Sequence, residues 1–535
     1  MKIIIFLVAT FLSFFSTAVM SYVSMAIPIG PWIAPTLALF AIIIFKVFSK
    51  FVSNGSQEMI LVTVAGSVGG ILATALGFYF TTLYFVDPIT FNSFMESPRY
   101  FIFVVGFLSL TAGMFGILVA NIVEHKLIVA DKLAFPVGEL VYKTISAYKS
   151  VKKSIELLIG FLATGLFCVL QDGLWKINGF IPRALTLFSK TTYSIFTIPA
   201  VRLDFWPMLW ALGFVTGHVV ALPLAVGVLS KILLIQPIYV LAFKDLTWME
   251  YIITFCSGIV LSTAIFGFIK TPQSLFKSAR GIFKKDLTVA KSSNKNFNLL
   301  EMMLVFFLFF SFTDYFKFSF LSKTFVLIFS FICAYQLAII AGKIGLAPMG
   351  KFATFVMVPA MFIFPLNYTQ IVLVATFVGI CGGVACDVLF GRKIAHMANI
   401  PVDTIKKYQY LGLIVSAAFA GVVFWFLINH FQLGSDQLFA LRAQNRWMLI
   451  NTLKNSKTLN YYVLILGTIF GLILSKVKVS PLLVLGGLFM PINITLGLVI
   501  GGIGALFVKD KQEWYPFWSG VYASNSIWML IKAIL

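Results

Sequence analysis

Long apolar runs separated by short polar turns recur along the whole chain. Most of them approach the roughly 20 residues that a helix needs to cross the hydrocarbon of a bilayer. Backbone groups in hydrocarbon must bond within the protein, and the runs lack the alternating pattern of a barrel, so the sequence predicts an all-α, polytopic membrane protein. We expect about sixteen spans on this length criterion. In the first half they are Ile3–Met25, Trp32–Phe45, Met59–Phe85, Tyr100–Ile122, Ile155–Leu174, Phe205–Val219, Ala221–Phe243 and Met249–Ile269. In the second half they are Leu299–Tyr315, Leu321–Ala341, Leu346–Leu366, Ile371–Phe390, Tyr408–Ile428, Leu459–Ser475, Pro481–Val508 and Trp514–Leu535.

One stretch interrupts this pattern because it is long, polar and basic. Lys270–Asn298 carries seven Lys or Arg residues against the single acidic residue Asp286. Lys and Arg beside membrane spans stay on the cytoplasmic side, which favours a cytoplasmic linker over a nucleic-acid-binding arm. The linker separates a first transmembrane repeat, residues 1–269, from a second part, residues 299–535. The distribution of Lys and Arg then predicts that both termini are in the cytoplasm. We expect the membrane to be the cell (inner) membrane.

Composition supports the membrane assignment. Of the 535 residues, 60% are hydrophobic and 11% are charged, and the mean hydropathy is +0.99, whereas soluble domains carry about 25% charged residues. We therefore expect membrane lipid around the protein. The net charge of +21 falls mostly in loops and implies no nucleic acid as a partner. The five cysteines are scattered and the four histidines lie far apart, so we expect no metal site and no cofactor.

Two segments are too short and too polar to face lipid. Lys132–Ser146 has charges towards both ends and a Pro-x-Gly near its start. Gln437–Leu453 carries Arg442 and Arg446 inside a helical pattern. Each segment is either an amphipathic helix at the surface or a re-entrant element buried in protein. The loop Lys176–Arg202 is basic although it falls on the outer side, and we expect it to hold a short segment of its own.

The two halves carry a repeated pattern of helix breaks. Pro207–Gly217 has Pro, Gly and Gly at the offsets where Pro481–Pro491 has Pro, Gly and Pro. Nearer the start of each half, a Gly/Pro turn at residues 29–35 is matched by one at residues 344–348. These matches predict a duplication, with Leu299–Tyr315 as an extra helix leading the second repeat. The count of spans makes the two repeats inverted, as in many alternating-access transporters.

These stretches resemble the oligopeptide transporter family, which includes the yellow-stripe-like metal-chelate transporters. Lys132–Glu139, KLAFPVGE, is similar to the family's Leu-x-(Phe/Tyr)-Pro-x-Gly stretch, and Ile340–Phe355 resembles its Gly/Pro turn. Gly383–Pro401 resembles its Asp-rich stretch, and Gly486–Gly502 one of its closing Gly-rich spans. The resemblance covers nearly the whole chain. The long acidic N-terminal extension of plant and fungal members is absent, and the chain is similar to the shorter bacterial members. It implies a membrane transporter of small peptides or metal chelates.

The sequence departs from the family's pattern at several positions. Gly391 stands where the family commonly has a second Asp, and Ala395 replaces a Gly. Glu139 and Leu140 replace small residues, and the Pro that commonly precedes Gln444 is absent. These departures leave open whether the substrate is a peptide or a metal chelate.

Asp387 is the strongest candidate for coupling transport to protons. It lies within the apolar run Ile371–Phe390, beside small residues that let a partner backbone approach. Charged groups inside membrane spans are costly and mark functional positions. Asp387 either takes up a proton during transport or forms a helix-end salt bridge with Arg392 or Lys393.

Other polar groups and helix breaks complete the set of candidates. Glu58 opens the third span, where the helix dipole also favours a negative charge. His218 lies at a break and is either a titratable group or a satisfied core histidine, and the mid-span Lys231 must be paired, cavity-facing or snorkelling. Helix breaks offer free amides and carbonyls to a substrate. The candidates for the substrate path and for coupling are Asp387, Glu58, His218, Pro136, Gly138, Glu139, Gly345, Pro348, Gln444, Gly487, Pro491 and Asn493.

The sequence favours a transporter over a membrane enzyme or a channel. It contains no Walker A motif and neither an HExxH nor a GxSxG motif. The repeated helix breaks favour a carrier over a channel. We therefore predict a secondary active, proton-coupled transporter of small oligopeptides or peptide-like metal chelates, with no catalytic residues.

Overall fold

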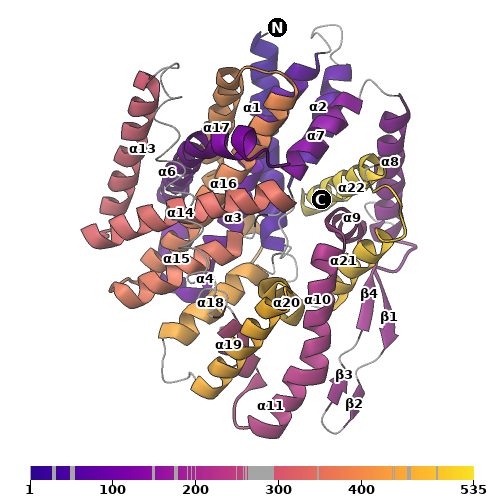
Figure 1. The fold of residues 1–535 in the computed structure, drawn as a ribbon, viewed down its shortest axis with the longest axis vertical. Helices are drawn as coiled ribbons and strands as arrows, with labels where there is room; N and C mark the ends of the chain where they lie inside the picture. The colour runs from indigo at the N-terminus through magenta and orange to yellow at the C-terminus, as the bar shows by residue number, and fades with distance from the viewer. Residues whose placement is uncertain are drawn as a thin grey trace. The chain divides into compact units, whose positions relative to one another are not determined.

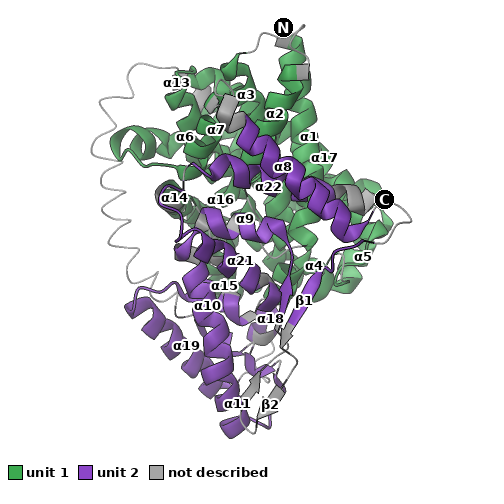
Figure 2. Ribbon diagram, turned by 90° about the vertical axis from the view of Figure 1, so that its right-hand side faces the viewer, with its two compact units in different colours: residues 1–151, 282–447 green, residues 152–281, 448–535 purple. Residues whose placement is uncertain are grey.

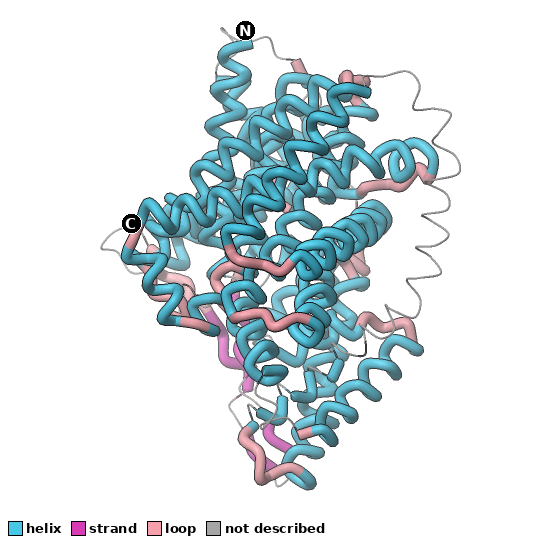
Figure 3. The backbone as a smooth tube through the Cα atoms, turned by 90° about the vertical axis from the view of Figure 1, so that its left-hand side faces the viewer, coloured by secondary structure: helices cyan, strands magenta, loops and turns pink. Residues whose placement is uncertain are grey.

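A computed structural model gives the fold of this chain. Helices dominate it, and the strands that it describes all lie between residues 184 and 204 (Figures 1 and 3). The structure describes residues 2–534 apart from residues 27–31, 48–54, 148–150, 174–178, 189–190, 194–195, 199–200, 249, 253, 257, 260–261, 263–294, 346, 348, 436–437, 439, 455–459, 490–491 and 512. Most of the expected basic linker, and the candidates Pro348 and Pro491, therefore lie outside the described residues.

The helices have the lengths and composition of a polytopic membrane protein. Eight described helices are long and apolar enough to cross a membrane, and four shorter apolar helices accompany them. The all-α membrane fold expected from the sequence is thus confirmed, apart from the strands at residues 184–204. Several expected spans are divided into shorter helices. The expected span Pro481–Val508, for example, contains two helices, residues 481–489 and 492–504. The boundary expected between Phe205–Val219 and Ala221–Phe243 lies at Gly217, whose φ of 65° is a conformation open chiefly to glycine.

The chain folds into two compact units, shown in green and purple in Figure 2. One unit consists of Met1–Val151 and Ile282–Trp447, and the other of Lys152–Gly281 and Met448–Leu535. Each unit takes one segment from each half of the sequence. The compact units therefore interleave the two halves instead of following the linker.

The first unit is a bundle of long helices. Its first segment contains α1 (Lys2–Ala26), α2 (Ala34–Val47), α3 (Ser56–Tyr79), α4 (Thr82–Val86), α5 (Pro88–Glu96), α6 (Pro98–Glu124), the π-helix η1 (His125–Ala130) and α7 (Pro136–Ala147). Its second segment contains α13 (Lys295–Tyr315), α14 (Phe320–Ile344), α15 (Met349–Ile363), α16 (Tyr368–Met397), α17 (Val402–His430) and the start of α18 (Leu441–Lys454).

Helices α3 and α16 form the centre of this unit. Every residue of α3 from Met59 to Tyr79 is buried, and α16 is buried along nearly its whole length. α3 packs against α1, α16 and α17, and α16 also packs against α6 and α14. Small residues permit this closeness: a Cβ at Gly412 of α17 would collide with the Ala65 carbonyl of α3. In lipid, where apolar surfaces gain little by leaving solvent, such close packing is what holds helices together.

The second unit contains shorter helices and a small hairpin. Its first segment contains α8 (Val151–Asp172), α9 (Pro207–Thr216), α10 (His218–Ser230), the π-helix η2 (Lys231–Ile235) and α11 (Gln236–Ala242). Its second segment contains the end of α18, α19 (Tyr461–Lys476), α20 (Pro481–Phe489), α21 (Ile492–Gly504) and α22 (Tyr515–Ile534). The loop expected to hold a short segment contains strands: β1 (Ala184–Phe188) pairs antiparallel with β4 (Val201–Asp204), and β2 (Thr191–Tyr193) with β3 (Phe196–Ile198).

Helix pairs in the second unit join one half of the sequence to the other through reciprocal glycines. In the pair α9–α21, a Cβ at Gly213 would collide with the Leu498 carbonyl, and one at Gly501 with the Trp210 carbonyl. A substitution at either glycine would therefore separate the two helices.

The pair α10–α20 has the same construction. A Cβ at Gly227 would collide with the Val484 carbonyl, and one at Gly487 with the Leu224 carbonyl. Gly487 follows Pro481 at the spacing at which Gly213 follows Pro207. Exchanging the two halves of the sequence thus turns one glycine pair into the other.

Candidate functional site

Asp387 lies in the interior of the first unit, where α16 crosses α3. The residue is only 2% exposed. The Ser67 hydroxyl of α3 donates a hydrogen bond of 2.7 Å to Asp387 Oδ2. Gly383 and Gly391 lie one helical turn before and after it, and a Cβ at Gly391 would come within 2.7 Å of Val64 Cγ1. Glycines on this face therefore let α3 approach the carboxylate, as the small residues in the sequence suggested.

The helix-end salt bridge that the sequence allowed for Asp387 is not formed. Lys393 donates from Nζ to the Leu133 carbonyl at 3.0 Å, and Arg392 pairs with Glu124. Among the residues that the structure describes, no cationic nitrogen lies within 4.0 Å of the Asp387 carboxylate. Asp387 is thus a buried carboxyl group whose hydrogen-bonding partner is a hydroxyl.

Arg392 is held by three side chains from two other helices. Its Nη1 pairs with Glu124 Oε2 at 2.9 Å and its Nη2 donates to Asn121 Oδ1 at 3.1 Å, both on α6. Its Nε donates to Gln409 Oε1 on α17 at 2.6 Å. Gln409 donates in turn to the Val388 carbonyl at 2.9 Å, which fixes the orientation of its amide. Every nitrogen of this buried guanidinium therefore has an acceptor.

A second carboxylate extends this network to α13. Asn121 Nδ2 donates to Glu301 Oε1 at 2.7 Å, and the Tyr410 hydroxyl donates to the same oxygen. Glu301 is only 6% exposed. α13 is thereby attached to α6 and α17 through polar contacts in addition to its apolar packing.

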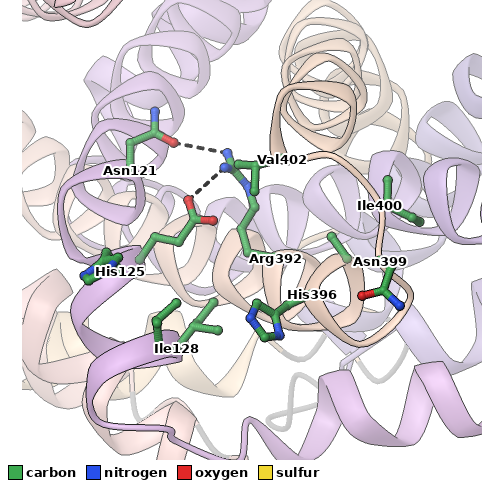
Figure 4. Close-up of a pocket in the computed structure, with 11 residues that line it drawn as sticks. Asn121, His125, Ile128, Arg392, His396, Asn399, Ile400 and Val402 are labelled. Atoms are coloured by element: carbon green, nitrogen blue, oxygen red, sulfur yellow. Dashed lines mark hydrogen bonds and ion pairs between the residues drawn. The ribbon is translucent and has the colours of Figure 1, made fainter. Parts of the chain in front are cut away.

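A cavity of about 420 Å³ opens beside this network (Figure 4). Its wall includes the ion pair of Arg392 and Glu124, and also His125 and His396. Figure 4 shows the guanidinium of Arg392 directed to Asn121 and to the neighbouring carboxylate, and the imidazoles of His125 and His396 lie below these contacts in the view. η1, which begins at His125, continues α6 as a π-helix, a distortion that is frequent at functional sites.

The sequence did not predict this cavity. Glu124 and His125 belong to no motif, and His396 was not singled out within Gly383–Pro401; the three residues come together only because the end of α6 meets the end of α16. The available signal was a cluster of polar residues directly after two apolar runs. Among the described residues, no group of three or more His, Cys, Asp or Glu side chains could hold a metal ion.

The structure brings several predicted candidates together at the start of α7. Gly138 packs against the Phe390 carbonyl of α16, where a Cβ would lie at 2.9 Å, and Glu139 is half-buried next to it. Gly345 ends α14 with a φ of 74°, close to Pro136, and its carbonyl accepts a 2.9 Å hydrogen bond from the Trp32 indole.

Helices α7 and α18, which begin inside the two segments set apart by their polarity, start in the same unusual way. Phe135 and Ala440, the residues just before them, adopt left-handed φ values of 50° and 49°. The Phe135 amide donates to the Gly342 carbonyl of α14 at 2.8 Å, and the Ala440 amide to the Met25 carbonyl of α1 at 2.7 Å. Such a conformation costs about 1–2 kcal/mol for a residue with a Cβ. Gln444 lies half-buried in the first turn of α18.

Each of the remaining candidates has surroundings of its own. Glu58 is in the first turn of α3, and its carboxylate folds back over Gly55, which agrees with a charge favoured by the helix dipole. His218 begins α10 and is exposed, so it is not the satisfied core histidine that was one of its two alternatives. In the second unit, Asn493 donates to Asp204 and Gly487 packs on α10. Lys231 begins η2 and is half-buried.

Comparison with known proteins adds one finding. A family model described as OPT oligopeptide transporter protein matches residues 3–525, nearly the whole chain. A search of curated proteins returned no match.

Proposed function

Because the chain belongs to the oligopeptide transporter family, a family of membrane transport proteins, we propose that it is a secondary active transporter driven by protons. Its substrates are small oligopeptides or peptide-like metal chelates. The protein is a multi-pass membrane protein, and we further propose that it lies in the cell (inner) membrane with both termini and the basic linker in the cytoplasm. The excess of Lys and Arg in that linker carries the orientation.

The buried Asp387 is the observation that carries the proton coupling. Carboxyl groups inside membrane bundles are typical members of proton relays. The Ser67 hydroxyl suits this role because it can donate to a carboxylate and accept from a carboxylic acid by rotating. Both protonation states of Asp387 would therefore keep a hydrogen-bonding partner without movement of α3 or α16.

The internal symmetry supports a carrier rather than a channel. The matching starts of α7 and α18, and the exchanged glycine pairs of the second unit, are what a duplication with two-fold symmetry gives, and the count of spans makes its repeats inverted. We propose that the repeats are residues 1–269 and 299–535, with α13 as the additional helix. In such transporters the substrate binds where broken helices of the two repeats meet.

Gradient-driven uptake into proteoliposomes tests the coupling. We expect Asp387→Asn to abolish accumulation of a labelled tripeptide under an imposed pH gradient while exchange without a gradient partly persists, because Asn resembles the protonated carboxyl group. Asp245→Asn is the matched control, since Asp245 is an exposed carboxylate in the turn after α11. Ferric chelates tested in parallel with tripeptides determine the substrate class.

Full gradient-driven accumulation by the Asp387→Asn protein, normalised to folded protein, would contradict the proposal. The coupling role would then pass to Glu58 or His218. The orientation of the protein in the membrane is tested separately with the Lys285→Cys variant. Modification of this cysteine by an impermeant reagent added outside would show that the linker is not cytoplasmic.

A further inference from the structure

A second buried arginine in the first unit, Arg446 of α18, is surrounded very differently from Arg392. It is 7% exposed. Its Nη1 donates to the Phe78 carbonyl at the end of α3, at 2.9 Å. Its guanidinium carbon lies 4.2 Å from the centroid of the Tyr79 ring, and that of Arg442 lies 4.3 Å from the centroid of the Phe78 ring. Two cations of one helix therefore lie on two aromatic rings of another.

Polar atoms around Arg446 lack the partners that burial requires. By ordinary hydrogen-bond geometry, Arg446 Nε, the Tyr79 hydroxyl and Asn445 Oδ1 are buried without a partner among the described residues, although the Tyr79 hydroxyl lies close to the Arg446 guanidinium. Within the described part of the chain, no carboxylate lies within 4.0 Å of the Arg446 guanidinium. The site thus offers a charged N–H donor, a hydroxyl donor and an amide whose oxygen and nitrogen can exchange places by a flip.

A buried guanidinium needs a counter-charge. Removing a cation from water is costly unless an anion or a full set of acceptors replaces the hydration shell. The carbonyl end of α3 and the face of Tyr79 supply part of this compensation. An anion bound beside Nε would supply the rest and would also give the Tyr79 hydroxyl an acceptor.

We propose that Arg446, together with Tyr79 and Asn445, binds a carboxylate group of the transported substrate. The proposal rests on the transport function proposed above, because that function supplies a ligand of this chemistry. The C-terminus of a short peptide and the carboxylates of a chelator present the same planar pair of oxygens, which a guanidinium recognises well. The Arg446 site adds to that function the chemical group of the substrate that the protein recognises.

Binding to the purified full-length protein in detergent, measured by calorimetry without any pH gradient, tests the site. The probes are trialanine and trialanine C-terminal amide. We expect the wild-type protein to bind the free acid roughly 10- to 100-fold more tightly, as charge-assisted hydrogen bonds imply. Arg446→Gln should bind both probes with the affinity of the amide. Arg183→Gln is the control, because Arg183 is an arginine with a 64% exposed side chain that pairs with Asp172.

A second variant keeps the test decisive if Arg446→Gln does not fold. Tyr79→Phe retains the ring under the guanidinium and removes only the hydroxyl. It should weaken binding of the free acid roughly 3- to 10-fold and leave the amide unchanged. Copper-loaded Gly-Gly-His and its C-terminal amide form a second pair of probes, and a preference for the free acid in this pair only assigns the site to a chelate.

Two results would overturn the Arg446 site. One is equal binding of free acid and amide to the wild-type protein in both probe pairs. The other is an undiminished preference for the acid in folded Arg446→Gln and in Tyr79→Phe. Neither result bears on proton coupling. The coupling proposal is contradicted only if the Asp387→Asn protein still accumulates substrate, so the two proposals are tested independently.

Discussion

Arg392 and Arg446 are both buried in the first unit, yet their surroundings give them opposite properties. Arg392 has a carboxylate and two amide oxygens on its three nitrogens. Arg446 has one backbone carbonyl and one aromatic ring, and its Nε has no partner among the described residues. Burial alone therefore does not say what a charged side chain does in a membrane protein.

We infer from this difference that Arg392 holds helices together, whereas Arg446 binds a ligand. Removing one member of a saturated ion pair leaves the other buried and uncompensated, which is strongly destabilising. Removing a buried cation that has no counter-ion removes its desolvation penalty from the protein without substrate. The two arginines should therefore respond to the same substitution with opposite signs.

The largest effect is expected from Arg392→Met. The substitution leaves Glu124 without its cation and the amides of Asn121 and Gln409 without their donor, and we expect a loss of about 3–5 kcal/mol of stability. Thermal unfolding in detergent, followed by intrinsic fluorescence, should show a large fall in Tm. The double substitution Arg392→Met with Glu124→Met should recover part of it. An unchanged Tm for the single variant would remove the structural role of the Arg392 network.

Arg446→Met should have a smaller effect of the opposite sign in the protein without substrate. A thioether side chain of similar reach removes the uncompensated charge, and we expect a gain of about 1–2 kcal/mol, reduced by the lost contacts with Tyr79 and Phe78. The same unfolding assay measures it. A fall in Tm comparable to that of Arg392→Met would show that both arginines stabilise the fold, which contradicts the difference inferred from their surroundings.

The smallest effect concerns the backbone that positions Arg446. Ala440→Gly relieves the left-handed conformation before α18 and should raise stability by about 1 kcal/mol. Ala443→Gly, inside the same helix, is the control and should lower stability by about 0.5–1 kcal/mol. Equal shifts in Tm for the two variants would show that the conformation of Ala440 carries no strain.

Much of the fold could be read from the sequence because helices in lipid obey local rules. Each backbone group must bond within its own segment, so apolar runs of sufficient length become helices. The breaks at Gly217 and Gly345 and the unusual starts of α7 and α18 were likewise marked by Gly, Pro and polar residues. Asp387 was recognisable as a carboxylate within an apolar run. The strands between Ala184 and Asp204 were not, since only an unspecified short segment was expected there.

Tertiary structure alone decided which of these segments meet. Ser67 reaches Asp387, Glu124 reaches Arg392, and the Phe78 carbonyl reaches Arg446, at chain separations of 320, 268 and 368 residues. The interleaving of the two halves into compact units belongs to the same level. Hydropathy says that a helix prefers lipid to water, but it ranks no neighbour above another. Neighbours are selected by close contacts of small residues and by polar pairs between distant positions, which no local pattern encodes.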